Sequence, residues 1–195
     1  MCKAIDNKKD ILLLLLYSPG NTDQFNEAVI GKTRLVKMLF LFHKECLRHF
    51  VKSTRITEEN FYEFFAWNFG PFSTQVYDDI MFFTLRGFIV EESTEEEVLP
   101  EAASEWWEWM RMSSPDAEQG GITDYDEHSF TLSDKGATFA KDLYGTLTTN
   151  QKKTLKTFKA EMNRRPLKAI LQYVYDRYPD FTSHSKSREQ VLGRK

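Results

Sequence analysis

The chain has little cysteine and no long apolar run. Two cysteines, Cys2 and Cys46, stand among 195 residues, too few for the disulfide framework of a small secreted domain. The longest apolar run, residues 11–17, is far shorter than the roughly 20 residues that span a bilayer. Asp6 and Asp10 precede it and no A-x-A-like cleavage site follows, unlike a secretory signal peptide. We therefore expect a cytoplasmic protein that does not engage a membrane.

Basic residues are scarce in the middle of the chain. Residues 61–130 hold only Arg86 and Arg111 against 16 acidic residues, a net charge of −14. Residues 1–60 hold 10 basic and 7 acidic residues (+3), and residues 131–195 hold 14 and 6 (+8), which together give the net −3. Phosphate contacts need lysine and arginine, so the middle part is unsuited to nucleic acid, whereas the two ends are not.

What is present suits a globular protein. Apolar residues make up 41%, aromatic residues 14% and charged residues 28% of the chain. That composition supplies a core and leaves aromatic rings for a surface. The length fits one ordinary domain with an appendage.

Apolar spacing predicts three helices in the first half of the chain. The first covers residues 6–17 and is apolar nearly all round, so we expect it at the centre of the core. The second covers residues 32–51, where apolar residues recur every three or four positions. The third covers residues 74–86, with Ser73 as N-cap and Gly87 just past its end.

Short extended segments separate and follow these helices. Residues 58–68 are rich in aromatic residues and are expected to be extended or a short strand. Strands are predicted at residues 88–90 and 128–132, on either side of an acidic insertion at about residues 91–121. That insertion contains Trp106, Trp107 and Trp109, on an expected helix between residues 100 and 112. Further helices are expected over residues 134–143, 149–163 and 165–178, with Ser133 as a cap and Pro166 in the first turn of the last one.

This order of elements is that of a winged helix, in which two strands after the third helix form a β-hairpin wing. Gly136 is expected to let the next helix pack close to the sheet. The predicted fold class is therefore mostly α with a small β-hairpin (α+β). We expect a winged-helix-like domain over residues 1–145, a helical extension over 146–181 and a basic, mobile tail over 182–195.

Several segments resemble the Panacea domain. Residues 31–40 (GKTRLVKMLF) are similar to its second helix. Also similar are the expected turn Gly70-Pro71-Phe72-Ser73, residues 76–79 (VYDD) and residues 85–89 (LRGFI). The match covers roughly residues 8–145; the family includes SocA-like antitoxins, and the YwgA-like bacterial and archaeal proteins look related. The resemblance implies a winged-helix-like fold, a non-enzymatic role and neutralisation of a toxin or another defence-linked partner by direct binding.

No catalytic or cofactor motif is complete. Residues 31–33 (GKT) resemble the end of a phosphate-binding loop, but Asn26 stands where that loop needs glycine. His43, Cys46 and His49 lie three residues apart on one helix, a conceivable metal set. Since Cys46 also belongs to the apolar stripe, we favour a buried cysteine with two surface histidines. We expect no enzyme activity, no cofactor and no metal.

DNA binding is one function class that a winged helix suggests. Here the recognition helix would bring Asp78 and Asp79 towards phosphates, and the wing tip, residues 91–97, carries five acids. Binding in the usual pose is therefore disfavoured. The alternative is a regulator that uses its basic C-terminal helices, although a solvated helix face is the favoured interpretation of the basic residues there. These residues are Lys152, Lys153, Lys156, Lys159, Arg164, Arg165 and Lys168.

The favoured class is a protein-binding module. An acidic, aromatic middle section suits a basic partner such as a toxin or a nucleic-acid-associated protein. The candidate contact residues are Asp78, Asp79, Trp106, Trp107 and Trp109. Solvation alone accounts for the aspartates, and core packing is the simpler interpretation of the tryptophans. A membrane-surface role for them is disfavoured by the surrounding acids.

Overall fold

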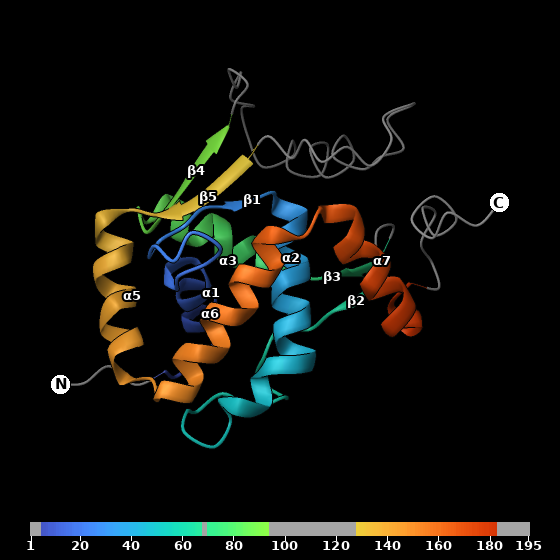
Figure 1. The fold of residues 1–195 in the computed structure, drawn as a ribbon, viewed down its shortest axis with the longest axis horizontal. Helices are drawn as coiled ribbons and strands as arrows, with labels where there is room; N and C mark the ends of the chain where they lie inside the picture. The colour runs from blue at the N-terminus through green and yellow to red at the C-terminus, as the bar shows by residue number, and fades with distance from the viewer. Residues whose placement is uncertain (1–4, 68–69, 94–127, 183–195) are drawn as a thin grey trace.

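The computed structural model describes residues 5–67, 70–93 and 128–182 (Figure 1). Over these residues the chain is mostly helical, with two small antiparallel sheets, in agreement with the predicted α+β class. The helices are α1 (Lys8–Tyr17), α2 (Lys32–Leu41), α3 (Thr74–Leu85), α5 (Asp134–Thr146), α6 (Thr149–Arg164) and α7 (Leu167–Arg177). The strands are β1 (Val29–Ile30), β2 (Phe65–Trp67), β3 (Gly70–Phe72), β4 (Ile89–Ser93) and β5 (His128–Leu132).

Helix α1 is the centre of the core, as its composition predicts. Asn7 and Asp10 close a capping box at its start, which satisfies backbone N–H groups that the helix itself leaves free. Residues 11–16 are all buried, and α1 contacts α5, α6 and β5 (Figure 1). No helix in the described ranges is both long enough and apolar enough to cross a membrane.

Helix α2 is shorter than predicted and changes its winding. The α-helical part ends at Leu41, a π-helical turn follows over Phe42–Cys46 and a 3-10 turn over Leu47–His49. A π turn inserts one residue into the helix and rotates the side chains that follow it. Leu47 and Phe50 are thereby buried together with Phe42, a combination that a regular helical period does not give.

The main sheet has the strand order β1-β5-β4. The two predicted strands are confirmed as the antiparallel pair β4 and β5, with Ile89 opposite Leu132. Strand β1 adds to the other edge of β5, with Val29 opposite Phe130. With only two residues, β1 has no alternation that a sequence pattern can reveal.

The second sheet is the hairpin of β2 and β3. The aromatic segment contains the expected strand, and Phe65 pairs with Phe72 across the hairpin. Gly70, Pro71 and Phe72 form strand β3, which corrects the prediction of a turn at these residues. The Phe65 and Phe72 rings lie 5.4 Å apart between centroids, so cross-strand ring contact favours the extended form.

Gly136 lies where α5 meets the main sheet, as predicted. A Cβ atom added to Gly136 would lie 2.1 Å from the carbonyl oxygen of Phe88. The hydroxyl oxygen of Ser133 accepts the Gly136 N–H at 3.1 Å, which confirms Ser133 as the N-cap. Gly87 also has its predicted place just past α3, with a φ of 67°.

The two C-terminal helices belong to the same core as the rest. Leu155 of α6 and Val174 of α7 are fully buried in the one apolar cluster that contains α1. Pro166 precedes α7 as its N-cap residue instead of standing in its first turn. The expected helix between residues 100 and 112 and nearly all of the expected tail lie outside the described residues.

Candidate protein-binding surface

Helix α3 exposes an unusual amount of apolar surface. Its inner side chains Val76, Ile80 and Phe83 are buried in the core. On the outer side, Met81 is 48%, Phe82 42% and Leu85 80% exposed, next to the exposed Asp78. We call Asp78, Met81, Phe82 and Leu85 the α3 surface. Adjacent exposed apolar side chains of this size are typical of a binding site.

Apolar residues lie all round α3, so composition alone does not reveal the α3 surface. Helical spacing places Leu85 one turn after Met81, on the side opposite Val76 and Ile80. Met81 and Phe82 widen the apolar arc of the helix beyond what one side can bury. That excess width is the signal in the sequence, because a helix that packs on only one side leaves the remainder of the arc in solvent.

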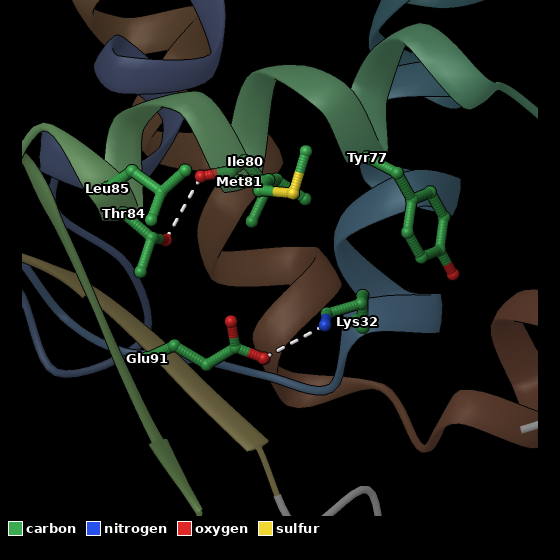
Figure 2. A pocket seen from close by; sticks show the side chains of 7 residues that line it. All are labelled: Lys32, Tyr77, Ile80, Met81, Thr84, Leu85 and Glu91. Atoms are coloured by element: carbon green, nitrogen blue, oxygen red, sulfur yellow. Dashed lines mark hydrogen bonds and ion pairs between the residues drawn. The ribbon is translucent and has the colours of Figure 1, made fainter. Parts of the chain in front are cut away.

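A small cavity lies beside the α3 surface (Figure 2). Its volume is about 210 Å³, and it lies between α3, the first residue of α2 and strand β4. At its charged end, Lys32 Nζ lies 2.9 Å from Glu91 Oε1, and His128 Nδ1 lies 3.0 Å from the same oxygen. The lining residues are Lys32, Tyr77, Ile80, Met81, Thr84, Leu85 and Glu91.

Aromatic rings continue from the cavity onto the β2–β3 hairpin. Phe65 is 42% and Trp67 49% exposed, and their ring centroids lie 6.0 Å apart. The Phe72 ring joins them to Tyr77, which lines the cavity, with a centroid distance of 5.1 Å to the Tyr77 ring. The exposed aromatic side chains of the hairpin therefore extend the α3 surface.

Asp79 does not belong to this surface, which corrects its assignment to partner contact. It is 6% exposed, because helical spacing puts it on the inner side of α3 with Val76 and Ile80. Its Oδ2 accepts the hydroxyl hydrogen of Tyr62 at 2.9 Å, and its Oδ1 lies 2.9 Å from Lys9 Nζ. Asp79 thus anchors α3 to the core, while its neighbour Asp78 is exposed.

These two adjacent acids predict opposite stability effects. Asp79→Ala removes partners from the Tyr62 hydroxyl and the Lys9 ammonium, so we expect the free energy of unfolding to fall by about 2–3 kcal/mol. Asp78→Ala, the matched control, should change it by less than about 0.5 kcal/mol. Urea denaturation of the two variants measures the difference. Equal losses would contradict the anchoring role of Asp79.

The prediction of Lys159 as a nucleic-acid contact is also wrong. Its side chain is fully buried, and its ammonium donates to the carbonyl oxygens of Leu16 at 2.6 Å and Ser18 at 2.9 Å. These carbonyls close the end of α1, where backbone acceptors lack helical partners. Lys159 therefore stabilises the end of α1 and cannot reach a phosphate.

The other basic residues of the C-terminal helices are distributed over contacts of their own. Lys156 Nζ lies 2.6 Å from Asp23, and Arg165 forms an ion pair with Glu161 one turn away. Arg164 donates to the side chain of Asn21 at 3.3 Å. The Lys152 ammonium lies 5.3 Å from the centroid of the Tyr144 ring. Lys153 and Lys168 are exposed.

The residues that carry the family resemblance meet inside the structure. The buried ammonium of Lys37 on α2 donates to the carbonyl oxygen of Pro71 on β3 at 2.7 Å. Gly70 is buried with a φ of 81°, and Ser73 is buried at the N-cap of α3 without a capping hydrogen bond from its side chain. These residues position the hairpin and α3; Trp106, Trp107 and Trp109 lie outside the described residues.

The histidine–cysteine set on the second helix is not brought together as a metal site. His43 Nε2 lies 2.8 Å from Glu58, and burial lowers the pKa of His43. Burial raises the pKa of the Cys46 thiol to about 12, so the thiol stays protonated. Within the described ranges, no group of three or more His, Cys, Asp and Glu side chains is arranged to hold a metal ion.

Comparison of the chain with protein-family models, with curated proteins and with solved structures finds no match.

Proposed function

We propose that this chain is a non-enzymatic protein-binding module that binds a basic protein partner through the α3 surface. The observation that carries the proposal is the outer side of α3, which offers Met81, Phe82 and Leu85 to solvent. The resemblance to the Panacea domain favours an antitoxin-like or defence-linked role for such a module. The partner would then be a toxin or another basic protein.

The arrangement of elements supports a winged-helix interpretation of the fold. The order α1, β1, α2, α3, β4, β5 and the strand order β1-β5-β4 are those of a winged helix, with the β2–β3 hairpin inserted before α3. In that fold, α3 is the helix that DNA-binding relatives insert into the major groove. Whatever binds in the usual place therefore meets the α3 surface.

The chemistry of α3 favours protein over DNA. Residues 74–85 contain no lysine or arginine. The cations beside the α3 surface are Lys9, which is paired with Asp79, and Arg86, at 4.4 Å and 5.6 Å from the centroid of the Phe82 ring, so this helix offers few cations to a phosphate. Three large apolar side chains gain free energy when a partner covers them, whereas a hydrated duplex backbone leaves them in water. Asp78 on the same side would be repelled by phosphates and attracted by a basic protein.

The C-terminal helices give little support to the DNA alternative. Lys159 is buried, and Lys156 and Arg165 are already neutralised by acids. Phosphate affinity depends on the number of cations that the nucleic acid can engage. Without the buried Lys159, the candidate set offers a nucleic acid fewer cations than the sequence suggests.

The proposal predicts that the α3 surface is required for capture of a basic protein. The double variant Met81→Ser, Leu85→Ser removes the largest exposed apolar area and should retain at least about 10-fold less partner than the unmodified protein. Tagged protein is incubated with lysate of the source organism at physiological salt, and retained proteins are identified by mass spectrometry. The expected outcome is one dominant protein with a strongly basic isoelectric point.

The matched control is Ile30→Ser on β1. Ile30 is 47% exposed, nearly the same as Met81, but lies outside the α3 surface. It should retain the partner fully. If the control and the double variant lose the partner equally, the capture depends on exposed apolar area in general and not on the α3 surface, which contradicts the proposal. Retention of duplex DNA alone, lost at high salt, would favour the DNA alternative.

A further inference from the structure

Strand β4 is an edge of the main sheet. The strand order β1-β5-β4 places β5 between the other two, so within the described residues β4 is paired on one side alone (Figure 1). A strand at an edge presents backbone N–H and C=O groups to whatever lies beside it. Such a row of groups specifies its ligand more closely than an apolar surface does, because the backbone of another extended segment matches its spacing.

The hydrogen bonds of β5 show which groups of β4 face outwards. The Leu132 N–H donates to the side chain of Asn26 at 2.7 Å, and the Leu132 carbonyl oxygen accepts from the same side chain at 2.8 Å. The His128 carbonyl oxygen accepts the Gly31 N–H at 2.8 Å. Asn26 precedes β1 and Gly31 follows it. Backbone groups alternate in direction along an antiparallel strand, so the even-numbered residues of β5 face β1 and its odd-numbered residues face β4.

Three residues of β4 therefore turn their backbone groups away from β5. Val90 and Glu92 lie opposite odd-numbered residues of β5, so their N–H and C=O groups bond inwards. The groups of the alternate residues face outwards, and within the described residues none of them takes part in a backbone hydrogen bond outside the strand ladders. These outward-facing residues are Ile89, Glu91 and Ser93.

The side chains of β4 alternate between two faces of the sheet. Ile89 is buried on the inner face, where Glu91 Oε1 lies 2.9 Å from Lys32 Nζ. Val90 and Glu92 point to the opposite, outer face, and both are exposed. Because Glu91 is neutralised by Lys32 and Glu92 forms no ion pair with a described residue, Glu92 is the charge that a strand beside β4 would meet on the outer face.

The nearest cations on the β4 side of the sheet lie at the other end of the strand. Lys135 Nζ lies 4.4 Å from the centroid of the Phe88 ring and donates to the carbonyl oxygen of Arg86 at 2.8 Å. Four residues of extended chain, about 13 Å, separate Phe88 from Glu92. The C-terminal end of β4 therefore attracts a base, and the cations at its start do not neutralise it.

We propose that an extended segment of the partner pairs with the outer edge of β4 and places a lysine or arginine beside Glu92. This inference rests on the proposed function for the basic character of the partner and specifies the conformation of the segment that binds. The backbone groups of Glu91 and Ser93 supply hydrogen bonds that any extended segment can form, and Glu92 selects a base. A second copy of β4 matches poorly, because it would add its own Glu91 and Glu92 to the same short ladder.

A synthetic strand tests the edge without the partner. The probe is the acetylated and amidated peptide Thr-Lys-Val-Lys-Val-Lys-Thr, in which lysines alternate with β-branched residues. Backbone amide hydrogen exchange of the full-length ¹⁵N-labelled protein is measured by NMR as peptide is added at physiological salt. At saturation, exchange should slow by at least about 10-fold at Glu91 and Ser93. It should change little at Val90 and Glu92, whose N–H groups are already bonded to β5.

Two control peptides separate the charges from the backbone. The same sequence with glutamate in place of lysine keeps the extended backbone and should bind about 10-fold more weakly, because Glu92 repels it. The same sequence with proline in place of both valines keeps the three lysines but cannot donate from those positions. The proline peptide should leave the exchange at Glu91 and Ser93 unchanged.

Two variants of the protein assign the signal to β4. Ser93→Pro removes an outward-facing N–H and leaves the bonds between β4 and β5 in place, so the affinity for the lysine peptide should fall about threefold or more. Glu92→Lys reverses the exposed charge and should also lower the affinity about threefold or more. Glu59→Lys makes the same change of charge at an exposed position before β2. This matched control should bind the peptide as the unmodified protein does.

The outcomes separate this inference from the proposed function. No slowing, or equal slowing along the whole of β4, overturns pairing at this edge, and equal binding of the glutamate peptide overturns the selection of a base. Slowing without peptide that grows with protein concentration assigns the edge to a second copy of β4 and also overturns the inference. None of these results involves Met81 or Leu85, so capture of a basic protein by the α3 surface is decided separately by Met81→Ser, Leu85→Ser.

Discussion

Gly136→Ala is expected to lower the free energy of unfolding by about 3 kcal/mol. The added Cβ would lie 2.1 Å from the Phe88 carbonyl oxygen and 2.9 Å from its carbon. The carbonyl cannot swing aside at no cost, because it accepts the Ser133 N–H at 3.0 Å. Either α5 moves away from the sheet or this hydrogen bond breaks, and both changes disturb the joint between α5 and the start of β4.

Gly145→Ala is the matched control for this prediction. Gly145 is in the same helix, α5, and nothing lies within 4 Å of a Cβ added there. Alanine has the higher helix propensity, so this variant should gain about 0.5–1 kcal/mol. Guanidinium denaturation of both variants gives the two values. A loss below about 1 kcal/mol for Gly136→Ala would show that α5 can shift and that the close approach to Phe88 is not required.

The cues that identified Gly136 also identified most of the secondary structure. Caps such as Ser133, the stop at Gly87 and helical spacing are local, so one stretch of sequence is enough to recognise them. The strands β1 and β3 are different, because a segment of two or three residues is too short for an alternating pattern and becomes a strand only through its pairing partner. Val29 pairs with Phe130, about 100 residues later in the sequence, and the residues next to Val29 in the sequence do not predict that pairing.

Buried polar residues, like the short strands, are features that local sequence patterns do not predict. Asp79 falls on the apolar side of α3, and Lys159 falls on the apolar side of α6 with Leu155 and Met162. Their positions therefore indicate burial, although their chemistry suggests a surface. The sequence does not show which group forms the hydrogen bonds that stabilise the buried charge. For Lys159 that group is the end of α1, more than 100 residues away in the sequence. The same problem hides the exposed side of α3, since only packing shows which side is covered.

The two buried lysines predict that the protein becomes more stable as pH rises above neutral. Burial lowers the pKa of Lys37 to about 7 and that of Lys159 to about 7, from the usual 10.5 of a lysine. Between about pH 7 and pH 10.5, the two lysines hold protons in the unfolded chain that they have released in the folded protein. Raising the pH in this range therefore favours folding. The limiting slope is about 1.4 kcal/mol per pH unit for each lysine, and we expect a total gain of about 2 kcal/mol or more from pH 7 to 9.

At more alkaline pH, groups whose pKa is raised in the folded protein oppose this gain in stability. Burial raises the pKa of Cys46 to about 12, and burial together with Asp79 raises the pKa of Tyr62. Above the ordinary pKa values of a thiol and of a tyrosine hydroxyl, about 9 and about 10, the unfolded chain loses these protons first, which favours unfolding. Because two lysines outweigh one cysteine, stability should pass through a maximum near pH 10, measured as the free energy of unfolding in urea at half-unit steps of pH.

Lys37→Met isolates one of the two lysines. Its ammonium has the Pro71 carbonyl as hydrogen-bond partner at 2.7 Å, and methionine keeps the apolar length of the side chain without the charge. The variant should lose about half of the gain between pH 7 and 9, while Lys153→Met, on the exposed side of α6, should keep all of it. An unchanged pH profile in Lys37→Met would mean that Lys37 keeps its charge in the folded protein, and it would contradict the lowered pKa of Lys37.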